Sequence, residues 1–457
     1  MIFSIFYIFV ALSAILIVTD MLGLVSKSKK TLFLLNITLL SIIGIVIAGM
    51  LAEGMNAAEF GLVSLNSFSL LFALMFTLGI IFVDILGYEE THYQSLLLFT
   101  GTALMGAFVV SFSNSVVSIF VGIEIISIAT IFAMIQKKKD TLEAAVKFFV
   151  MSAIVIAIFS FGMVLFYGAT GTVMLVKDYG MSTLLVSMIL LITALAFEAT
   201  LFPFNLWAPD VYQGAPTFAT AMVGGINKKV GFVALIEIMF IAFVAYRGVF
   251  SNIFYILAVF TMFYGNLVAI AQKNVKRMMA YSSIAQAGYI LIGLAVTTGY
   301  GIEGSIVQIF MHMLMFIGVM GVVLFMEKRN RNELNDYIGL YSENKLAAIA
   351  LTVLLLSLIG MPLTGGFVGK FILFSSAVYN NMIWLAIFGI INSVISIYYY
   401  AKIMLNMFAR KASARIESMG FAIGFVVVAC AVLIIAFGIY PQPIIQAAQS
   451  AASYIAP

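Results

Sequence analysis

The chain has 457 residues, of which 64% are hydrophobic and only 9% charged, and its net charge is +4. A soluble protein carries roughly 25% charged residues, so this composition excludes a soluble enzyme and indicates a protein with many membrane spans. The single cysteine, Cys430, excludes an internal disulfide and a four-cysteine iron–sulfur site. The two histidines, His92 and His312, lie far apart and belong to no haem or metal-binding motif. We therefore expect neither a metal nor a redox cofactor in this chain.

A membrane-spanning helix needs about 20 apolar residues, and about fourteen stretches meet this requirement. They are residues 2–24, 31–51, 66–88, 94–112, 115–136, 144–168, 182–206, 216–246, 251–272, 279–298, 303–326, 346–372, 380–408 and 418–440. No linker is long enough to separate a soluble domain. We predict one all-α polytopic membrane domain over 1–457, with three N-terminal helices (1–90), two five-helix units (94–246 and 251–408) and a C-terminal helix (418–440).

Basic residues are concentrated in alternate loops. The loops after even-numbered spans hold only Lys177 and Arg247. The loops after odd-numbered spans, with their flanks, hold Lys27, Lys29, Lys30, Lys137, Lys138, Lys139, Lys147, Lys273, Lys276, Arg277, Lys328, Arg329, Arg331, Lys345, Arg410, Lys411 and Arg415. Since basic loops stay inside, the sequence predicts a multi-pass protein of the cell's inner (plasma) membrane with both termini outside. We interpret the basic clusters as topology signals and expect no nucleic-acid partner.

Two of the predicted spans are interrupted. The seventh contains Pro203, which removes a backbone donor and clashes with the preceding turn, and the twelfth contains GMPLTGG at 360–366. When spans 4–8 and 9–13 are taken as two sets of five, each break falls in the fourth helix of its set. Because five is odd, the second set starts from the opposite side of the membrane. This pattern predicts two inverted repeats, broken helices 7 and 12, and a transport path near the midplane.

Five of the ionisable side chains inside the predicted spans are the leading functional candidates, because lipid makes such residues costly. Glu124 lies in the fifth span, Glu198 at the break in the seventh, Lys228 and Lys229 near the middle of the eighth, and Lys370 just after the break in the twelfth. Adjacent helical residues point about 100° apart, so only one of the paired lysines is expected to face a narrow channel. We predict a proton relay of Glu124, Glu198, Lys228 and Lys370, and hypothesise that Lys229 balances Glu198.

Three further ionisable residues are weaker candidates. His312 is either a relay or a hydrogen-bonded packing residue in its span. Lys402 either reaches the inner surface or ends the proton path. Glu143, with Asp140 or Thr141 before it, resembles a helix cap.

Three segments carry a resemblance to one family. They are PFNLWAPDVYQGAP at 203–216, NVKRMMAYSSIAQAGY at 274–289, and the stretch from GMP at 360–362 to GFVGKF at 366–371. Together they resemble the antiporter-like membrane subunits of NADH–quinone oxidoreductase, respiratory complex I. The segment DVYQGAP at 210–216 favours subunit N within that group. The resemblance covers about residues 95–443.

The resemblance implies fourteen helices and a proton-translocating subunit in the membrane arm of the complex. It implies sister antiporter-like subunits as partners within the bilayer, with iron–sulfur clusters, flavin and quinone only in partner subunits. The family's central residues are a glutamate in the fifth helix and lysines in the seventh, eighth and twelfth helices. Glu124, Lys228 and Lys370 occupy the positions in the fifth, eighth and twelfth. The seventh-helix position, usually lysine, is Glu198 here, so the usual glutamate–lysine pair becomes two carboxylates. The polar residue often found near the tyrosine-serine-serine segment is Gln286.

The leading interpretation is a proton-pumping translocase subunit, without a redox centre of its own, in a complex I-type quinone oxidoreductase. A subunit of a multi-subunit sodium/proton antiporter or of a membrane-bound hydrogenase is the alternative. A purely scaffolding role is disfavoured by Glu124, Glu198 and Lys370. The sequence leaves open whether the electron donor is NADH, ferredoxin or F420, and whether the coupled ion is only the proton.

Overall fold

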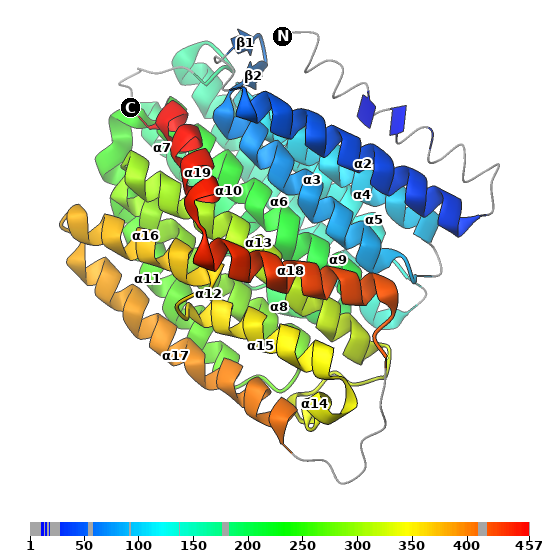
Figure 1. Ribbon diagram of the computed structural model, residues 1–457. Coiled ribbons are helices and arrows are strands. Elements are labelled where there is room, and N and C mark those ends of the chain that lie inside the picture. Colours follow the sequence, from blue (N-terminus) through cyan, green and yellow to red (C-terminus); the bar gives the residue numbers. More distant parts are fainter. Residues whose placement is uncertain are drawn as a thin grey trace.

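The computed structural model is a bundle of long helices that run side by side (Figure 1). It describes residues 11, 12, 14, 15 and 18 and the ranges 28–53, 58–90, 93–136, 138–175, 182–409 and 418–456. Most of the predicted first span lies outside these residues. So do His92 and several of the basic residues used for the topology, namely Lys27, Lys137, Lys177, Arg410, Lys411 and Arg415.

The bundle is built from helices and one small hairpin. The helices are α2 (Lys29–Ala52), α3 (Ser67–Gly87), α4 (Tyr93–Ser111), α5 (Val116–Met134), α6 (Lys139–Thr170), α7 (Ser182–Glu198), α8 (Ala208–Gly214), α9 (Thr217–Met222), α10 (Lys228–Glu237), α11 (Arg247–Ile270), α12 (Val275–Val296), α13 (Gly299–Glu327), α14 (Leu340–Glu343), α15 (Lys345–Ile359), α16 (Gly365–Tyr379), α17 (Ile383–Phe408), α18 (Phe421–Ile439) and α19 (Gln442–Ile455). Strands β1 (Ala58–Phe60) and β2 (Val63–Leu65) pair antiparallel, with Ala58 opposite Leu65.

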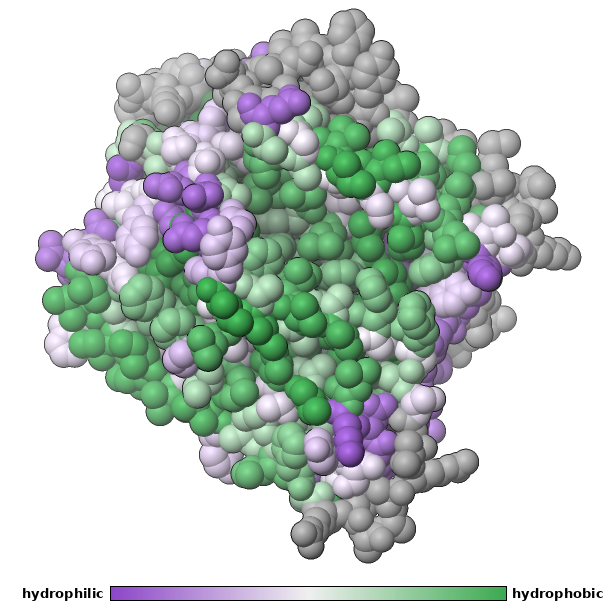
Figure 2. All heavy atoms as spheres, in the orientation of Figure 1, coloured by the Kyte–Doolittle hydropathy of each residue, from purple (hydrophilic) through white to green (hydrophobic). Residues whose placement is uncertain are grey.

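Ten helices in the described ranges are long and apolar enough to cross a membrane. Three shorter apolar helical stretches, Thr183–Glu198, Lys345–Ile359 and Gly365–Tyr379, lie beside the predicted breaks. Figure 2 shows hydrophobic side chains over the middle of the visible face, with hydrophilic ones gathered toward its ends. The prediction of an all-α membrane protein is therefore confirmed, while the number of fourteen spans stays a prediction.

Several helices begin where a polar side chain caps the first turn. Asn66 accepts a hydrogen bond from the backbone of Ser69 at 2.9 Å at the start of α3, and Asn274 accepts one from Arg277 at 3.0 Å at the start of α12. Such caps satisfy backbone amides that have no partner within the helix. The sequence thus fixes where α12, which carries much of the polar interior, enters the bundle.

Helices α12 and α13 occupy the centre of the bundle. The most apolar windows of both are fully buried, whereas that of the peripheral α6 is only 22% buried. Helix α13 packs against α12, α16 and α18, and α12 also packs against α8 and α11. Polar residues on α12 and α13 therefore face protein rather than lipid.

The first predicted break is present. Helix α7 ends at Glu198, and residues 199–207 lead without regular helix to α8. The backbone amide of Phe202 donates to the hydroxyl of Thr261 at 3.1 Å, and the Trp207 indole donates to the carbonyl of Phe197 at 3.3 Å. These contacts with side chains satisfy part of the backbone that the break frees, as an interrupted helix inside a membrane requires.

The second predicted break separates α15 from α16. It begins at Gly360, whose φ of +93° lies in the left-handed region that favours glycine. The amide of Gly366 then donates to the hydroxyl of Ser357 at 3.0 Å. A Cβ on Gly366 would lie 2.0 Å from the Ser357 carbonyl oxygen, so only glycine permits this approach.

The eighth predicted span is divided rather than one regular helix. Helix α9 passes into a π-helix, Val223–Asn227, then into α10 and a second π-helix, Ile238–Ala242. π-helical turns are found frequently at functional sites. The first of them ends immediately before Lys228.

The cap predicted at the start of α6 is wrong. The N-cap residue is Lys138, and it makes no capping hydrogen bond through its side chain. Thr141 lies inside the first turn, so its hydroxyl donates back to the carbonyls of Gln136 and Lys138. Glu143 instead pairs with Lys147, one turn further along, at 2.8 Å.

Candidate functional site

Lys228 and Lys229 are buried at the start of α10, 1% and 0% exposed respectively. The Lys228 ammonium donates to both the carbonyl and the hydroxyl of Ser283 on α12. The Lys229 ammonium lies 2.9 Å from the carbonyl oxygen of Gly224 and 2.6 Å from Nδ1 of His312 on α13. The two lysines therefore point to different helices, as their helical spacing requires.

Of the two ways in which Lys229 could balance Glu198, directly or through water, the structure excludes the direct ion pair. The Lys229 ammonium contacts His312, whereas Glu198 ends α7 and lies against α10 at Gly231. A Cβ on Gly231 would come within 2.8 Å of the Glu198 Cβ, so the two helices touch there. Gly231 and Lys229 are two residues apart and so point to nearly opposite sides of α10, which explains why Lys229 faces α13 instead.

Two acidic candidates, Glu198 and Glu124, lie on α7 and α5. Glu198 is 6% exposed, and Glu124 is half-buried. Helices α7 and α5 both pack against α10. Among the described residues, neither side chain has a hydrogen bond or an ion pair. The structure thus places two acidic residues on helices beside α10, without a basic partner in direct contact.

Lys370 on α16 is 3% exposed and is held by the second break. Its ammonium donates to the carbonyls of Leu358 and Ile359 at 3.0 and 2.9 Å and to the hydroxyl of Ser393 at 3.2 Å. It also lies over the ring of Tyr289, 4.2 Å from the centroid. The last carbonyls of a helix have no partner within that helix, so the end of α15 itself supplies acceptors for Lys370.

Two glutamines connect the lysine of α16 to the interior. Gln286 on α12 donates to the Leu358 carbonyl at 3.0 Å, which is the carbonyl that Lys370 also uses. Gln308 on α13 donates to Gln286 at 2.9 Å. Gln308 and His312 are one turn apart on the same face of α13. Within the described chain, Oε1 of Gln308 and Nε2 of His312 have no hydrogen-bond partner, although both are buried.

These contacts define a buried polar row that crosses the centre of the bundle. It consists of Lys228, Ser283, Lys229, His312, Gln308, Gln286 and Lys370. The sequence singled out the three lysines, His312 and Gln286, but it missed Ser283 and Gln308. A polar residue one turn before His312 in an apolar helix was the available signal for Gln308. Lys402 is exposed on α17 and takes no part in the row.

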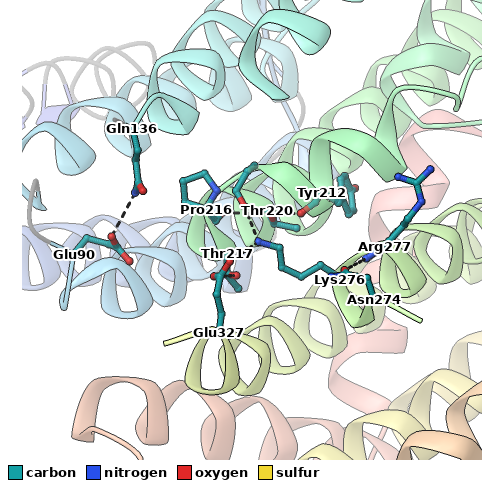
Figure 3. Close-up of polar contacts among 11 residues, drawn as sticks. Glu90, Gln136, Tyr212, Pro216, Thr217, Thr220, Asn274, Lys276, Arg277 and Glu327 are labelled. Atoms are coloured by element: carbon teal, nitrogen blue, oxygen red, sulfur yellow. Dashed lines mark hydrogen bonds and ion pairs between the residues drawn. The ribbon is translucent and has the colours of Figure 1, made fainter. Parts of the chain in front are cut away.

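A polar basin lies at one end of the bundle, a cavity of about 720 Å³ lined by residues from the ends of α6, α8, α12 and α13. Lys276 reaches into this region but is only 3% exposed. Figure 3 shows its ammonium between the α8–α9 turn and Glu327, donating to the Ala215 carbonyl at 2.7 Å and to the Glu327 carboxylate at 2.8 Å. The other oxygen of Glu327 accepts the hydroxyl of Thr217. The ends of α8, α9, α12 and α13 are thereby tied together.

Asp210 forms the outer edge of the basin. Its carboxylate binds Arg277 at 2.6 Å and Lys147 at 3.0 Å. Burial raises the pKa of this carboxyl, but the hydrogen bonds and charges of Arg277 and Lys147 outweigh burial and hold its pKa below the usual range. Several of the basic residues used for the topology therefore lie together around this basin.

Comparison with known proteins identifies the wider group. The family described as NADH:quinone oxidoreductase/Mrp antiporter, transmembrane, matches residues 113–396. NADH-quinone oxidoreductase subunit N of Trichlorobacter lovleyi is 35% identical, over 94% of this chain and 92% of the relative. F(420)H(2) dehydrogenase subunit N of Methanosarcina mazei is also 35% identical, over 86% of this chain and 85% of the relative.

A solved structure has the same fold. A chain in respiratory complex I from Thermus thermophilus superposes with a TM-score of 0.83 and 27% identity, covering 96% of this chain and 98% of that chain. The similarity therefore extends over nearly the whole length of both chains. From its sequence and its structure, this chain belongs to the NADH:quinone oxidoreductase/Mrp antiporter transmembrane family, among the relatives named subunit N.

Proposed function

We propose that this chain is a proton-translocating membrane-arm subunit of a complex I-type quinone oxidoreductase. It acts as a translocase without a redox group of its own, driven by electron transfer in partner subunits. The observation that carries this proposal is the buried polar row, in which three lysines less than 4% exposed are set among hydrogen-bonding groups of α12, α13 and the second break. Buried cations are costly, and a scaffold does not require them.

The row supports proton transfer in defined steps. A neutral lysine amine accepts a proton at Nζ, and the resulting ammonium returns it to a neighbouring acceptor. At Lys229 the acceptor is Nδ1 of His312, 2.6 Å away. A proton taken up at Nδ1 allows the same ring to release one from Nε2, which has no hydrogen-bond partner among the described residues. Gln286 and the Leu358 carbonyl then orient groups around Lys370. The row thus joins the two halves of the chain.

Glu124 and Glu198 serve the entrance to the row from the α5 side. Two interacting carboxylates avoid ionising together because like charges repel. We infer that at least one of them carries a proton in the resting state. In that state Glu198 needs no ion pair with Lys229, in keeping with the contacts of Lys229 to His312 and Gly224.

The assembly and its orientation follow from the same reasoning. Relatives named as subunits of NADH-quinone oxidoreductase and F(420)H(2) dehydrogenase support the presence of partner chains. We propose that these partners include sister antiporter-like subunits and that the flavin, iron–sulfur clusters and quinone belong to them. The gathering of basic residues around the basin supports an inward-facing basin in the inner (plasma) membrane, with both termini outside. The two breaks support fourteen spans arranged as two inverted five-helix repeats.

Lys370→Ala tests the function. The complex is purified with its partner subunits, placed in vesicles containing a pH-sensitive dye, and supplied with NADH, or with F420H2 if NADH gives no turnover. We expect normal assembly but strongly reduced proton pumping. Lys345→Ala, an exposed lysine at the start of α15, is the matched control and should pump normally. Wild-type pumping by Lys370→Ala would contradict the proposal.

A further inference from the structure

One face of α12 leads from the polar basin to the buried polar row. Lys276, at the basin, and Ser283, which holds Lys228, are seven residues apart and thus lie on the same face of this helix. Two helical turns span about 10.5 Å at 1.5 Å per residue. Helix α8 packs along this part of α12, since Asp210 near its start binds Arg277 and Ala215 just after its end binds Lys276.

Tyr212 lies on α8 where this packing takes place. It is 1% exposed, and the residues directly after it, 213–217, line the basin. Its ring packs edge-on against Trp207 and Phe316, with centroids 6.3 and 5.7 Å away. Its carbonyl accepts the hydroxyl of Thr220 at 3.1 Å. In the view of Figure 3 the residue lies between Thr220 and Arg277.

The hydroxyl of Tyr212 is polar, buried and unpartnered. It makes no hydrogen bond to any residue that the structure describes. Helix α8, which carries Tyr212, packs against α12, which carries Ser283. Burial raises the pKa of the Tyr212 phenol, and the Ser283 hydroxyl offsets part of that rise. Buried polar groups are satisfied in most proteins, so an exception requires an explanation. The explanation cannot be packing alone, because phenylalanine would fill the same space without an unmet donor.

We propose that the Tyr212 hydroxyl carries protons between the polar basin and the Ser283–Lys228 pair. This inference rests on the proposed function, since it assigns the entry step of the same pathway. Its basis is the buried phenol on α8: residues 213–217 directly after it line the basin, and α8 packs against α12, which carries Ser283.

The proposed step conserves charge on the phenol. When Lys228 is a neutral amine, Ser283 gives its hydroxyl proton to Nζ of Lys228, and the Tyr212 O–H bond breaks as its proton passes to the Ser283 oxygen. A basin water then gives a proton to the Tyr212 oxygen and takes up a replacement from the other waters. One proton thereby moves from the basin to Lys228, and both hydroxyls end as they began.

The contact of Lys276 and Thr217 with Glu327 gives these residues a positioning role. They tie the turn after α8 to α12 and α13 and so hold α8, which carries Tyr212, against α12. None of the three is required to pass the proton itself.

Tyr212→Phe, which removes only the phenol oxygen, tests the proposal in the intact complex. Groups that transfer protons contribute roughly 10²–10⁴-fold to a rate, and basin water can replace part of the route, so we expect pumping to fall about tenfold. The thermal half-life of the complex should stay at the wild-type value, because the ring contacts are kept. Ser283→Ala, which leaves the carbonyl contact to Lys228, should lower pumping in the same direction.

Tyr337→Phe is the matched control. Tyr337 is also fully buried with an unpartnered hydroxyl among the described residues, but it ends the short 3-10 helix Leu334–Tyr337 before α14 and is not a member of the buried polar row. It should pump normally. Wild-type pumping by Tyr212→Phe, while Lys228→Ala is impaired, would overturn the assignment. So would a loss of pumping matched by Tyr337→Phe or by a shortened half-life. If Lys228→Ala and Lys370→Ala also pump normally, the proposed function itself fails and the assignment falls with it.

Discussion

The contact between Lys229 and His312 allows a quantitative prediction. Both side chains are fully buried, and Nζ and Nδ1 are 2.6 Å apart. A hydrogen bond that involves a charged group contributes roughly 1.5–3 kcal/mol. Each 1.4 kcal/mol corresponds to a factor of about ten. The fold reduction in pumping rate of the double variant should therefore differ from the product of the two single-variant reductions by roughly 10- to 150-fold.

The measurement is a double-mutant cycle. Lys229→Ala, His312→Ala and the double variant are assembled into the complex, and initial rates of proton pumping are compared per assembled complex. Each single variant should be strongly impaired, since it leaves a buried partner without its contact. The double variant should be little worse than either single one, because the second change removes a group already deprived of its partner.

A second cycle pairs Lys229→Ala with Glu198→Gln. The structure places no direct contact between these two side chains, so their effects should multiply without coupling. A coupling to Glu198 larger than the coupling to His312 would refute the reasoning and would show that Glu198 provides the main counter-charge. Complex yield for every variant separates a loss of pumping from a loss of assembly.

Three further predictions concern a carboxylate at the basin, the second break and the membrane topology. Glu327→Gln removes the charge from a carboxylate whose side chain is 31% exposed. The stability of the complex should fall by about 1.5 kcal/mol, the lower limit for a charged hydrogen bond, and its thermal half-life should shorten. An unchanged half-life would contradict this. Gly366→Ala places a Cβ 2.0 Å from the Ser357 carbonyl oxygen and should prevent assembly, whereas Gly424→Ala, with no atom within 4 Å of the added carbon, should assemble normally on native gels; equal yields would show that the second break can relax. A reporter fused after Arg331 should be exposed inside the cell, and one in the turn between β1 and β2 outside, whereas the reverse pattern would overturn the predicted topology.

The sequence alone was sufficient for the class of fold and for most members of the site. A chain with so many apolar and so few charged residues is stable only with most of its length in membrane spans. An ionisable residue within such a span is easily recognised, because lipid disfavours it. Proline and glycine also act locally, so the positions of both breaks followed from Pro203 and from the residues around Gly360. Lys370 was identified for the same reason, because it follows that break.

Tertiary structure decided which groups these residues contact. Lys228 and Lys229 are neighbours in sequence, yet one binds α12 and the other α13, and only the rotation of α10 within the bundle settles that choice. The link through Gln308 likewise depends on how α12 and α13 pack. These contacts join residues far apart in the chain, and their geometry comes from side-chain packing between helices. Hydrophobicity along the sequence determines that a helix is buried, but the packing of its neighbours determines which way each polar side chain points.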